Sequence, residues 1–231
     1  MITKKEKLKE FIQSQKYFSV KKVRNYFENS SVEIAQTSIY KYLQDLQREN
    51  EIFDAGEGWY STLQAEFKLD KSSVTSLVEQ MNQKFPDLDF CVWSTEQIAS
   101  YYHHLPTKFS TFLYTEKKFL SAMTDYFRGG DYQVLNNPGP EEMKKQFFIE
   151  ENPLVIRPGI SEEPRLEHYA MIQKILVDLW KKKNSPVIDA MEYKKIFKNL
   201  VMEQRINVAK LFRYADRRSC KEEIKNLLIA K

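Results

Sequence analysis

The sequence has few of the residues that build metal sites, cofactor sites or covalent frameworks. Its 231 residues include 2 cysteines, 3 histidines and 6 glycines. Cys91 and Cys220 are too few and too far apart in sequence for a disulfide framework or a zinc knuckle, so we expect both thiols to be reduced. The few glycines form no GxGxxG fingerprint and no phosphate-binding loop, which argues against the common nucleotide-binding folds. We therefore expect no metal and no cofactor.

The sequence also lacks any long apolar run. No stretch approaches the roughly 18 apolar residues of a membrane span, and none follows the opening Met-Ile-Thr-Lys-Lys. We therefore expect no signal peptide, no membrane partner and a cytoplasmic location. A composition of 42% hydrophobic and 29% charged residues is typical of a globular protein, and the length favours two domains.

The net charge of +4 is unevenly distributed along the chain. Residues 1 to 62 have a net charge of +1, residues 63 to 162 have −4, and residues 163 to 231 have +7. The basic terminal segment indicates either a second nucleic-acid contact or a docking surface for an acidic partner. Lysines that only keep the outer faces of helices soluble would produce the same pattern.

The first 62 residues show the pattern of a small helical domain. Three apolar stripes at helical spacing predict three helices: Leu8, Phe11 and Ile12; Val20, Val23 and Phe27; and Ile39, Leu43 and Leu46. Ser19 is placed to cap the second helix and Thr37 to cap the third, with a polar turn over residues 28 to 36 between them. After the third helix, two short strands around Gly56-Glu57-Gly58 predict a hairpin. This order predicts a winged helix-turn-helix.

The third predicted helix has a polar face opposite its apolar stripe. At 100° per residue, Thr37, Lys41, Gln44 and Arg48 project from that face, and Ser38 lies beside Thr37. Lysine and arginine bind phosphate or guanine, glutamine binds adenine, and hydroxyls bind either bases or phosphate. We therefore predict that these five residues face the major groove of double-stranded DNA. Lys22 and Arg24 on the second helix are predicted to contact the DNA backbone, although exposed charges of this kind are also common on helices that bind nothing.

The rest of the chain predicts an α+β domain over residues 63 to 231. A helix near residues 73 to 84 precedes strands near 88 to 93 and 109 to 114, and Ser94 with Gln97 forms a capping-box pattern. Thr115 is predicted to cap a helix that contains Phe119 and Phe127, and further strands are predicted at 132 to 135, 147 to 149 and 154 to 156. From about residue 163 every apolar pattern is helical, which predicts a C-terminal helical array. The overall fold class is thus α+β, with a winged helix, a small α/β sheet domain and C-terminal helices.

The order of these parts resembles the antitoxins of AbiE-type abortive-infection systems. The closest similarity lies in residues 89 to 95 (Asp-Phe-Cys-Val-Trp-Ser-Thr), which lead into a helix, and residues 109 to 115 (Phe-Ser-Thr-Phe-Leu-Tyr-Thr). The resemblance covers about residues 3 to 160 and rests on the pattern of elements. It implies a DNA-binding repressor of its own operon, which counters a nucleotidyltransferase toxin in phage defence. It implies no catalysis by this chain.

Two alternatives remain open from the sequence. A winged helix is also used as a protein-interaction scaffold, and the net charge of +1 over residues 1 to 62 does not decide between DNA and protein. Pro86-Asp87 followed by Glu116-Lys117-Lys118 fits the PD…ExK spacing of metal-dependent nucleases. In such nucleases the acid and lysine project from a strand, whereas Glu116 and Lys118 are predicted at the start of a helix. We therefore favour a binding protein over an enzyme.

Overall fold

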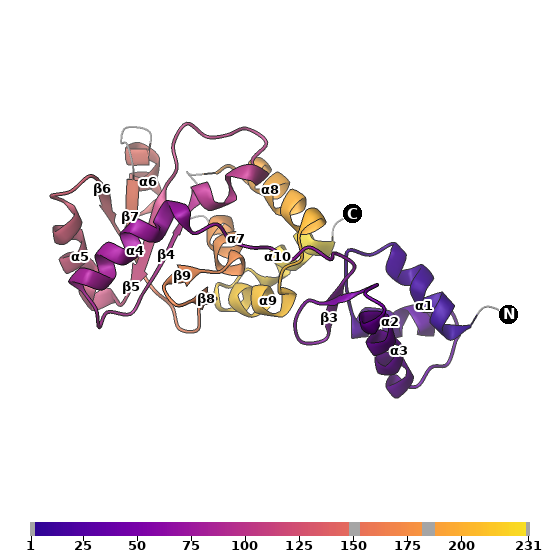
Figure 1. Cartoon of the computed structure of the whole chain (residues 1–231). Coiled ribbons are helices and arrows are strands. Elements are labelled where there is room, and N and C mark those ends of the chain that lie inside the picture. Colours follow the sequence, from indigo (N-terminus) through magenta and orange to yellow (C-terminus); the bar gives the residue numbers. More distant parts are fainter. Residues whose placement is uncertain (1–2, 148–152, 182–187, 230–231) are drawn as a thin grey trace. The chain divides into compact units, whose positions relative to one another are not determined.

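The computed structural model describes residues 3–147, 153–181 and 188–229 and shows an α+β protein (Figure 1). The chain divides into two compact units. The first unit comprises Met1–Phe67 and Asn199–Phe212, and the second comprises Lys68–Lys198 and Arg213–Lys231. None of the helices in the described ranges combines the length and apolar character that are needed to cross a bilayer.

The first unit contains three helices and a three-stranded antiparallel sheet. In chain order its elements are α1 (Lys4–Gln13), β1 (Tyr17–Ser19), α2 (Val20–Asn29), α3 (Gln36–Arg48), β2 (Phe53–Asp54) and β3 (Trp59–Ser61). The strand order is β1-β3-β2, so the central strand β3 pairs Tyr60 with Phe18 on one side and with Asp54 on the other. The strand β1 was not predicted from the sequence, in which only its last residue, Ser19, was recognised as the cap of α2.

The core of the first unit is formed by the apolar stripes that predicted its helices. Leu8, Phe27, Ile39 and Leu43 are fully buried, together with Phe18 of β1. The Ser19 hydroxyl accepts a hydrogen bond from the Lys22 amide, which confirms the predicted cap of α2. The prediction for Thr37 was wrong. The helix α3 begins two residues earlier than predicted, with Ala35 at the N-cap and no side-chain cap, and Thr37 lies in the first turn.

The first unit also contains residues 199–212, which the sequence pattern did not place there. This segment consists of the end of α8 (Ala190–Glu203), a turn and the start of α9 (Val208–Arg217). The Tyr17 hydroxyl donates a hydrogen bond to the Gln204 carbonyl oxygen over 2.6 Å and accepts one from the Ile206 amide over 2.9 Å. These two bonds fix the segment to β1.

The second unit is built on a six-stranded mixed sheet in the order β6-β7-β5-β4-β9-β8. Its strands are β4 (Phe90–Ser94), β5 (Thr111–Thr115), β6 (Gln133–Asn136), β7 (Pro153–Pro158), β8 (Arg165–Leu166) and β9 (Tyr169–Ala170). β5, β6 and β7 are parallel, whereas β4 is antiparallel to β5. This sheet lies among the helices of the second unit (Figure 1).

Helices pack on both faces of this sheet. α4 (Ser72–Lys84) and α5 (Leu120–Phe127) bury Leu77, Met81 and Met123 against one face, where Leu113 and Ile156 project from the strands. On the other face α7 (Ile172–Trp180) places the Lys174 ammonium 3.5 Å from the centre of the Tyr114 ring. The remaining helical elements are η1 (Thr95–Tyr101), η2 (Lys117–Phe119), α6 (Pro140–Phe147) and α10 (Lys221–Ile229).

Several predicted elements of the second unit differ from the structure. The capping box of Ser94 and Gln97 is present, but the helix that it opens is the 3₁₀ helix η1. Thr115 does not cap a helix. It ends β5, and its hydroxyl donates to the Asp89 carbonyl oxygen across the strand pair. Residue 147 ends α6 and was wrongly predicted to start a strand, while positions 148 and 149 lie outside the described residues.

The segment after residue 163 is not wholly helical. β8 and β9 precede the first C-terminal helix, which begins only at Ile172. β9 pairs with β4 and therefore extends the sheet beyond the strands that were predicted. These strands have two residues each, which is too short for a period-two pattern to be recognised. The four helices predicted from the apolar spacing after residue 170 are confirmed as α7, α8, α9 and α10.

Candidate nucleic-acid interface

The helix α3 has one fully buried face and one polar face. Ile39, Leu43 and Leu46 are completely buried in the core of the first unit. Thr37, Lys41, Gln44 and Arg48 are all exposed on the opposite side, and Ser38 is half-buried beside them. The structure thus brings together the four side chains that the helical periodicity placed on one face.

The side chains on this polar face make few contacts with the described residues of the protein. Among the described residues, the Lys41 ammonium and the Gln44 amide form no ion pair or hydrogen bond. Arg48 has only a long contact of 3.8 Å with Asp45, and 80% of its side chain is exposed. Tyr40 adds a large ring that is 43% exposed. These side chains can therefore contact a partner without first breaking strong internal bonds.

The helix α3 is held in place by ion pairs to α1 at its C-terminal end. The Glu49 carboxylate lies 2.6 Å from the Lys5 ammonium and 3.1 Å from the Lys9 ammonium. The Lys9 ammonium also lies 2.5 Å from the Glu51 carboxylate. The hydrogen bonds from Lys5 and Lys9 lower the pKa of the Glu49 carboxyl group to about 2. Glu49 and Glu51 therefore neutralise Lys5 and Lys9 of α1, and the polar face of α3 keeps its own cations.

The two predicted backbone contacts on α2 lie on different sides of that helix. They are two residues apart, which corresponds to a rotation of about 200°. The Lys22 ammonium donates to the Gln15 side-chain oxygen over 2.6 Å, whereas Arg24 is exposed and lines a hollow in front of α3. Of the two, only Arg24 shares this hollow with the residues that lead into α3.

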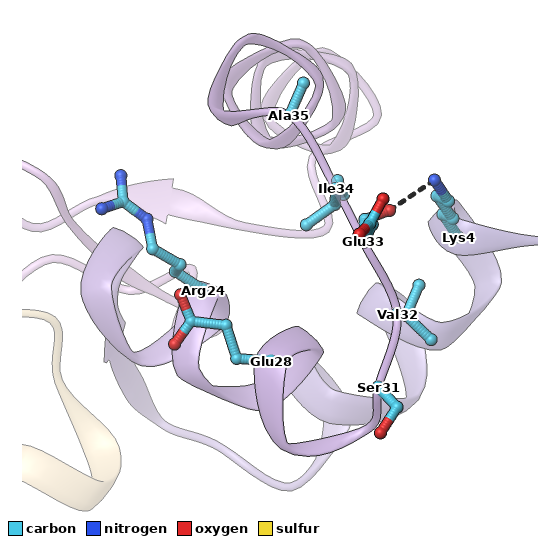
Figure 2. A pocket seen from close by; sticks show the side chains of 8 residues that line it. All are labelled: Lys4, Arg24, Glu28, Ser31, Val32, Glu33, Ile34 and Ala35. Atoms are coloured by element: carbon cyan, nitrogen blue, oxygen red, sulfur yellow. Dashed lines mark hydrogen bonds between the residues drawn. The ribbon is translucent and has the colours of Figure 1, made fainter.

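This hollow has a volume of about 830 Å³ and lies at the start of α3 (Figure 2). Arg24 and Lys4 contribute cations, and the Lys4 ammonium donates to the Glu33 carbonyl oxygen over 2.6 Å. Glu28 and Glu33 contribute carboxylates, so the lining has mixed charge. The sequence did not single out Lys4, because its proximity to Glu33 depends on the packing of α1.

The hairpin after α3 is packed against the segment 199–212 of the same unit. The Val208 amide donates to the Ala55 carbonyl oxygen over 2.7 Å, and the rings of Trp59 and Phe212 meet edge to face with centroids 5.4 Å apart. The Arg205 guanidinium lies 5.0 Å from the centre of the Phe53 ring. The hairpin is therefore stabilised by residues from the far end of the chain, which no local pattern could reveal.

The acid and the lysine of the nuclease spacing are paired with each other in the structure. Glu116 is the N-cap of η2, and Lys118 is bound to Glu116 itself at 2.9 Å. Within the described part of the chain, no group of three histidine, cysteine or acidic side chains is arranged to hold a metal ion. The lysine of the pattern neutralises the neighbouring acid.

Comparison with known proteins gives a family for the chain. A profile described as a family of unknown function, DUF6577, matches residues 38–231, which is more than four fifths of the sequence. The chain belongs to the DUF6577 family. No curated protein matches it. The part that matches the DUF6577 profile contains Lys41, Gln44 and Arg48 together with the whole second unit.

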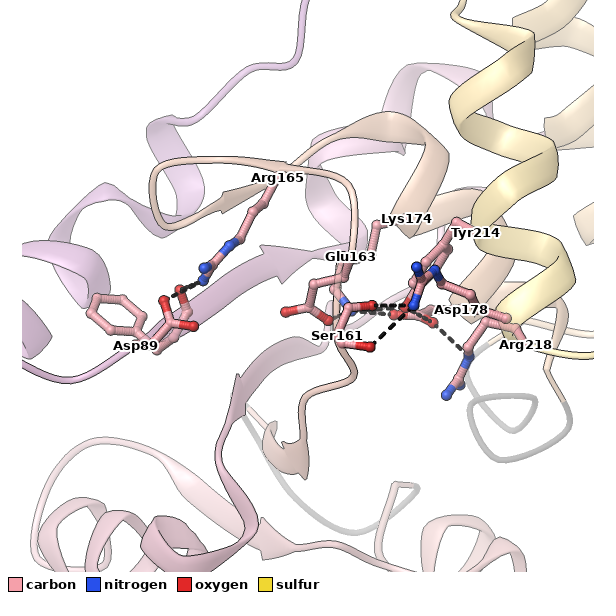
Figure 3. Close-up of polar contacts among 10 residues, drawn as sticks. Asp89, Ser161, Glu163, Arg165, Lys174, Asp178, Tyr214 and Arg218 are labelled. Atoms are coloured by element: carbon pink, nitrogen blue, oxygen red, sulfur yellow. Dashed lines mark hydrogen bonds and ion pairs between the residues drawn. The ribbon is translucent and has the colours of Figure 1, made fainter.

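The second unit of this DUF6577 protein contains a buried charge network beneath its sheet (Figure 3). The fully buried Lys174 ammonium lies 2.7 Å from Glu163 and 2.8 Å from Asp178. Asp178 also accepts a hydrogen bond from the Tyr214 hydroxyl over 2.9 Å and lies 3.3 Å from Arg218. Burial tends to lower the pKa of Lys174, but its neighbours, Asp178 first, hold that pKa well above its usual value.

Several basic side chains near the C-terminus form ion pairs within the chain. Lys174 and Arg218 bind Asp178, Arg205 binds Glu66, and Arg217 binds Glu162. Lys221 and Lys225 also have acidic neighbours within 3.5 Å. The acids Asp178, Asp216 and Glu222 are already counted in the net charge of +7, and only Glu66 and Glu162 lie outside the segment. These pairs therefore leave most of the basic excess near the C-terminus in place.

Proposed function

We propose that this protein binds double-stranded DNA, with α3 in the major groove. The observation that carries this proposal is the polar face of α3, on which Lys41, Gln44 and Arg48 are exposed while the opposite face is completely buried. A major groove accepts one helix whose exposed side chains reach the base edges. Arg24 would contact phosphate beside the start of α3, and Lys22 would do so only after releasing Gln15.

We further propose that the first unit is a winged helix-turn-helix domain. Three helices and three antiparallel strands occur in the order α1-β1-α2-α3-β2-β3, with β3 at the centre of the sheet. The two strands after α3 are joined by a tight turn in which Gly56 and Gly58 both have positive φ angles. This order supports the assignment of α2 and α3 as the helix pair and of β2 and β3 as the wing.

The side chains of α3 suit distinct roles in such a complex. Lys41 and Arg48 would bind guanine or phosphate, and Gln44 would make paired hydrogen bonds to adenine. Thr37 and Ser38 lie in the first turn, where hydroxyls commonly contact phosphate or base edges. The chain would thus act as a binding protein rather than an enzyme.

The biological role that we propose is that of an antitoxin and repressor of its own operon. The resemblance to AbiE-type antitoxins supports this role, because a helical unit with an exposed polar helix precedes a sheet unit in which β4, η1 and β5 follow one another. The partner would be a nucleotidyltransferase toxin encoded beside this protein. An adjacent gene for such an enzyme would support this role, and its absence would argue against it.

A DNA-binding experiment tests the first proposal. Binding of the full chain to the region upstream of its gene would be measured by gel shift and fluorescence anisotropy at low salt. The double variant Lys41→Ala, Gln44→Ala should lose specific binding. A matched control is Gln83→Ala, Lys84→Ala, which removes the same two side-chain types from the exposed end of α4. The control should bind as the wild type does.

The outcome also separates the proposal from its alternative. If the wild type does not bind the upstream DNA at low salt, the first unit is better regarded as a protein-interaction module. If it binds but the double variant binds equally well, α3 is not the recognition helix. We propose that the second unit, with its sheet and C-terminal helices, neutralises the toxin. In an antitoxin, the Lys41→Ala, Gln44→Ala variant should therefore still protect cells from the co-expressed toxin.

A further inference from the structure

The second unit contains a polar hollow of about 640 Å³ that is separate from the proposed DNA interface. One wall is the first half of α4, and the other walls come from the end of β4, the start of β5 and the residues before β6. Every residue that lines it belongs to the second unit. The hollow is large enough for a small molecule with one or two rings.

The wall formed by α4 is a stripe of small polar side chains. Ser73, Ser76 and Gln80 line the hollow at spacings of three and four residues, which place them on one side of the helix. The opposite side, with Leu77 and Met81, packs into the core. The Ser73 hydroxyl oxygen is buried, and no described residue forms a hydrogen bond with it. Because that oxygen is not accessible from the hollow, the exposed side chains of Ser76 and Gln80 provide the polar atoms of this wall.

The other walls combine carboxylates with aromatic rings. Glu96 and Asp131 line the hollow, and neither forms an ion pair within the described residues. Phe109 and Tyr132 contribute half-buried rings, and Lys108 is the one basic side chain in the lining. Two carboxylates beside a single lysine disfavour a phosphate or another anion.

We propose that this hollow binds a neutral polyhydroxylated ring, either the ribose of a nucleoside or a free monosaccharide. Glu96 and Asp131 would accept hydrogen bonds from neighbouring hydroxyl groups, as acidic residues do for ribose in dinucleotide sites. The Ser76 hydroxyl and the Gln80 amide would complete the hydrogen bonds on the side of α4. Phe109 and Tyr132 would pack against the apolar face of the sugar or of the base. This proposal does not depend on DNA binding by the first unit.

Calorimetric titration of the full chain tests this proposal. The probes are adenosine, cytidine, uridine, D-ribose and D-glucose, each taken to millimolar concentrations. At least one should bind saturably, and the class that binds distinguishes a nucleoside site from a sugar site. Because hydrogen bonds to charged groups are strong, Glu96→Gln and Asp131→Asn should each weaken binding at least about tenfold.

Two further variants separate binding from effects on folding. Ser76→Ala should weaken binding without lowering the unfolding temperature, because its exposed hydroxyl forms no hydrogen bond among the described residues. Asp125→Asn removes an exposed carboxylate from α5 outside the hollow and should bind as the wild type does. The proposal is overturned if no probe binds saturably, or if the double variant Glu96→Gln, Asp131→Asn binds with unchanged affinity.

Discussion

Asn207 packs directly against Gly56, at the turn between β2 and β3. A Cβ atom added to Gly56 would lie 2.3 Å from the Asn207 Oδ1, which is closer than real Cβ atoms approach their neighbours. Asn207 is itself held, because its Oδ1 accepts the Lys210 amide at the start of α9 over 2.8 Å. Gly56 also has a φ angle of +93°, in the region that glycine occupies most easily. The turn therefore requires glycine for two separate reasons.

We predict that Gly56→Ala destabilises the protein more than Gly58→Ala. Gly58 also has a positive φ, but an added Cβ would meet only Val20, at 4.0 Å. The Gly58 variant should lose about 1–2 kcal/mol for its backbone conformation, whereas Gly56→Ala should lose about 2–4 kcal/mol because crowding adds to that cost. Denaturant unfolding of both variants measures the difference. Equal losses would show that Asn207 moves aside at little cost.

Much of the fold was predictable because its signals are local. The apolar residues Leu8, Phe27 and Leu43 recur at helical spacing, and all three are buried. Ser19 and the pair Ser94–Gln97 form the caps that their positions predicted. Such patterns depend on a few neighbouring residues, so they can be recognised in the sequence without knowledge of the tertiary structure.

The caps predicted at Thr37 and Thr115 failed for different reasons. Threonine is a good cap, but the neighbouring residues Ala35 and Glu116 occupy the N-cap positions instead. At Ala35 no side chain accepts hydrogen bonds from the free amides of the first turn. Alanine is a poor N-cap residue, so sequence preference alone argues against a helix start at this position. At Thr115 the hydroxyl is used to bind Asp89 across two strands. Tertiary pairing overrode the local preference there.

The polar face of α3 was predictable, but its surroundings were not. The spacing of Lys41, Gln44 and Arg48 determines their common face once the helix forms. Lys4 beside Glu33 and Asn207 beside Gly56 are contacts between segments that are distant in sequence. No period or motif encodes such contacts, so the hollow in front of α3 and the support of the hairpin emerge only from the folded chain.

The buried network of Lys174 and Asp178 predicts asymmetric mutational effects. Asp178→Ala should destabilise the protein by about 3–5 kcal/mol, because it leaves the buried Lys174 and the partly buried Arg218 without their shared carboxylate. Lys174→Met should cost less, since Asp178 keeps Tyr214 and Arg218 as partners. Denaturant unfolding measures both. The control Glu116→Ala breaks an exposed pair and should change the stability by about 0–1 kcal/mol. A larger loss for Lys174→Met would contradict this account.

The lowered pKa of Glu49 predicts an acid-sensitive contact between α1 and α3. Because its pKa in the folded protein is about 2, below the usual 4.5, the carboxylate stabilises the fold fully above about pH 4.5. That contribution is lost progressively as the pH falls from about 4.5 towards 2. The difference in unfolding temperature between the wild type and Glu49→Gln should therefore shrink over this range. Glu10→Gln, which alters an exposed acid of α1, serves as the matched control.

Salt dependence should assign separate roles to the residues of α3. For the wild type, the logarithm of the DNA affinity should fall linearly with the logarithm of salt concentration, by about 0.9 for each phosphate contact. If Lys41 binds phosphate, Lys41→Ala should make this slope shallower by about 0.9 and weaken binding to all sequences alike. Gln44 carries no charge, so Gln44→Ala should leave the slope unchanged.

The same series predicts where the specificity lies. Gln44→Ala should reduce discrimination at one A·T base pair by about 1–3 kcal/mol, which competition between the upstream DNA and single-base variants would measure. A loss of specificity with an unchanged slope is the result expected of a base contact in the major groove. If Gln44→Ala instead weakened binding to every sequence equally, the helix would lie along the phosphate backbone, and recognition would have to come from the shape of the DNA.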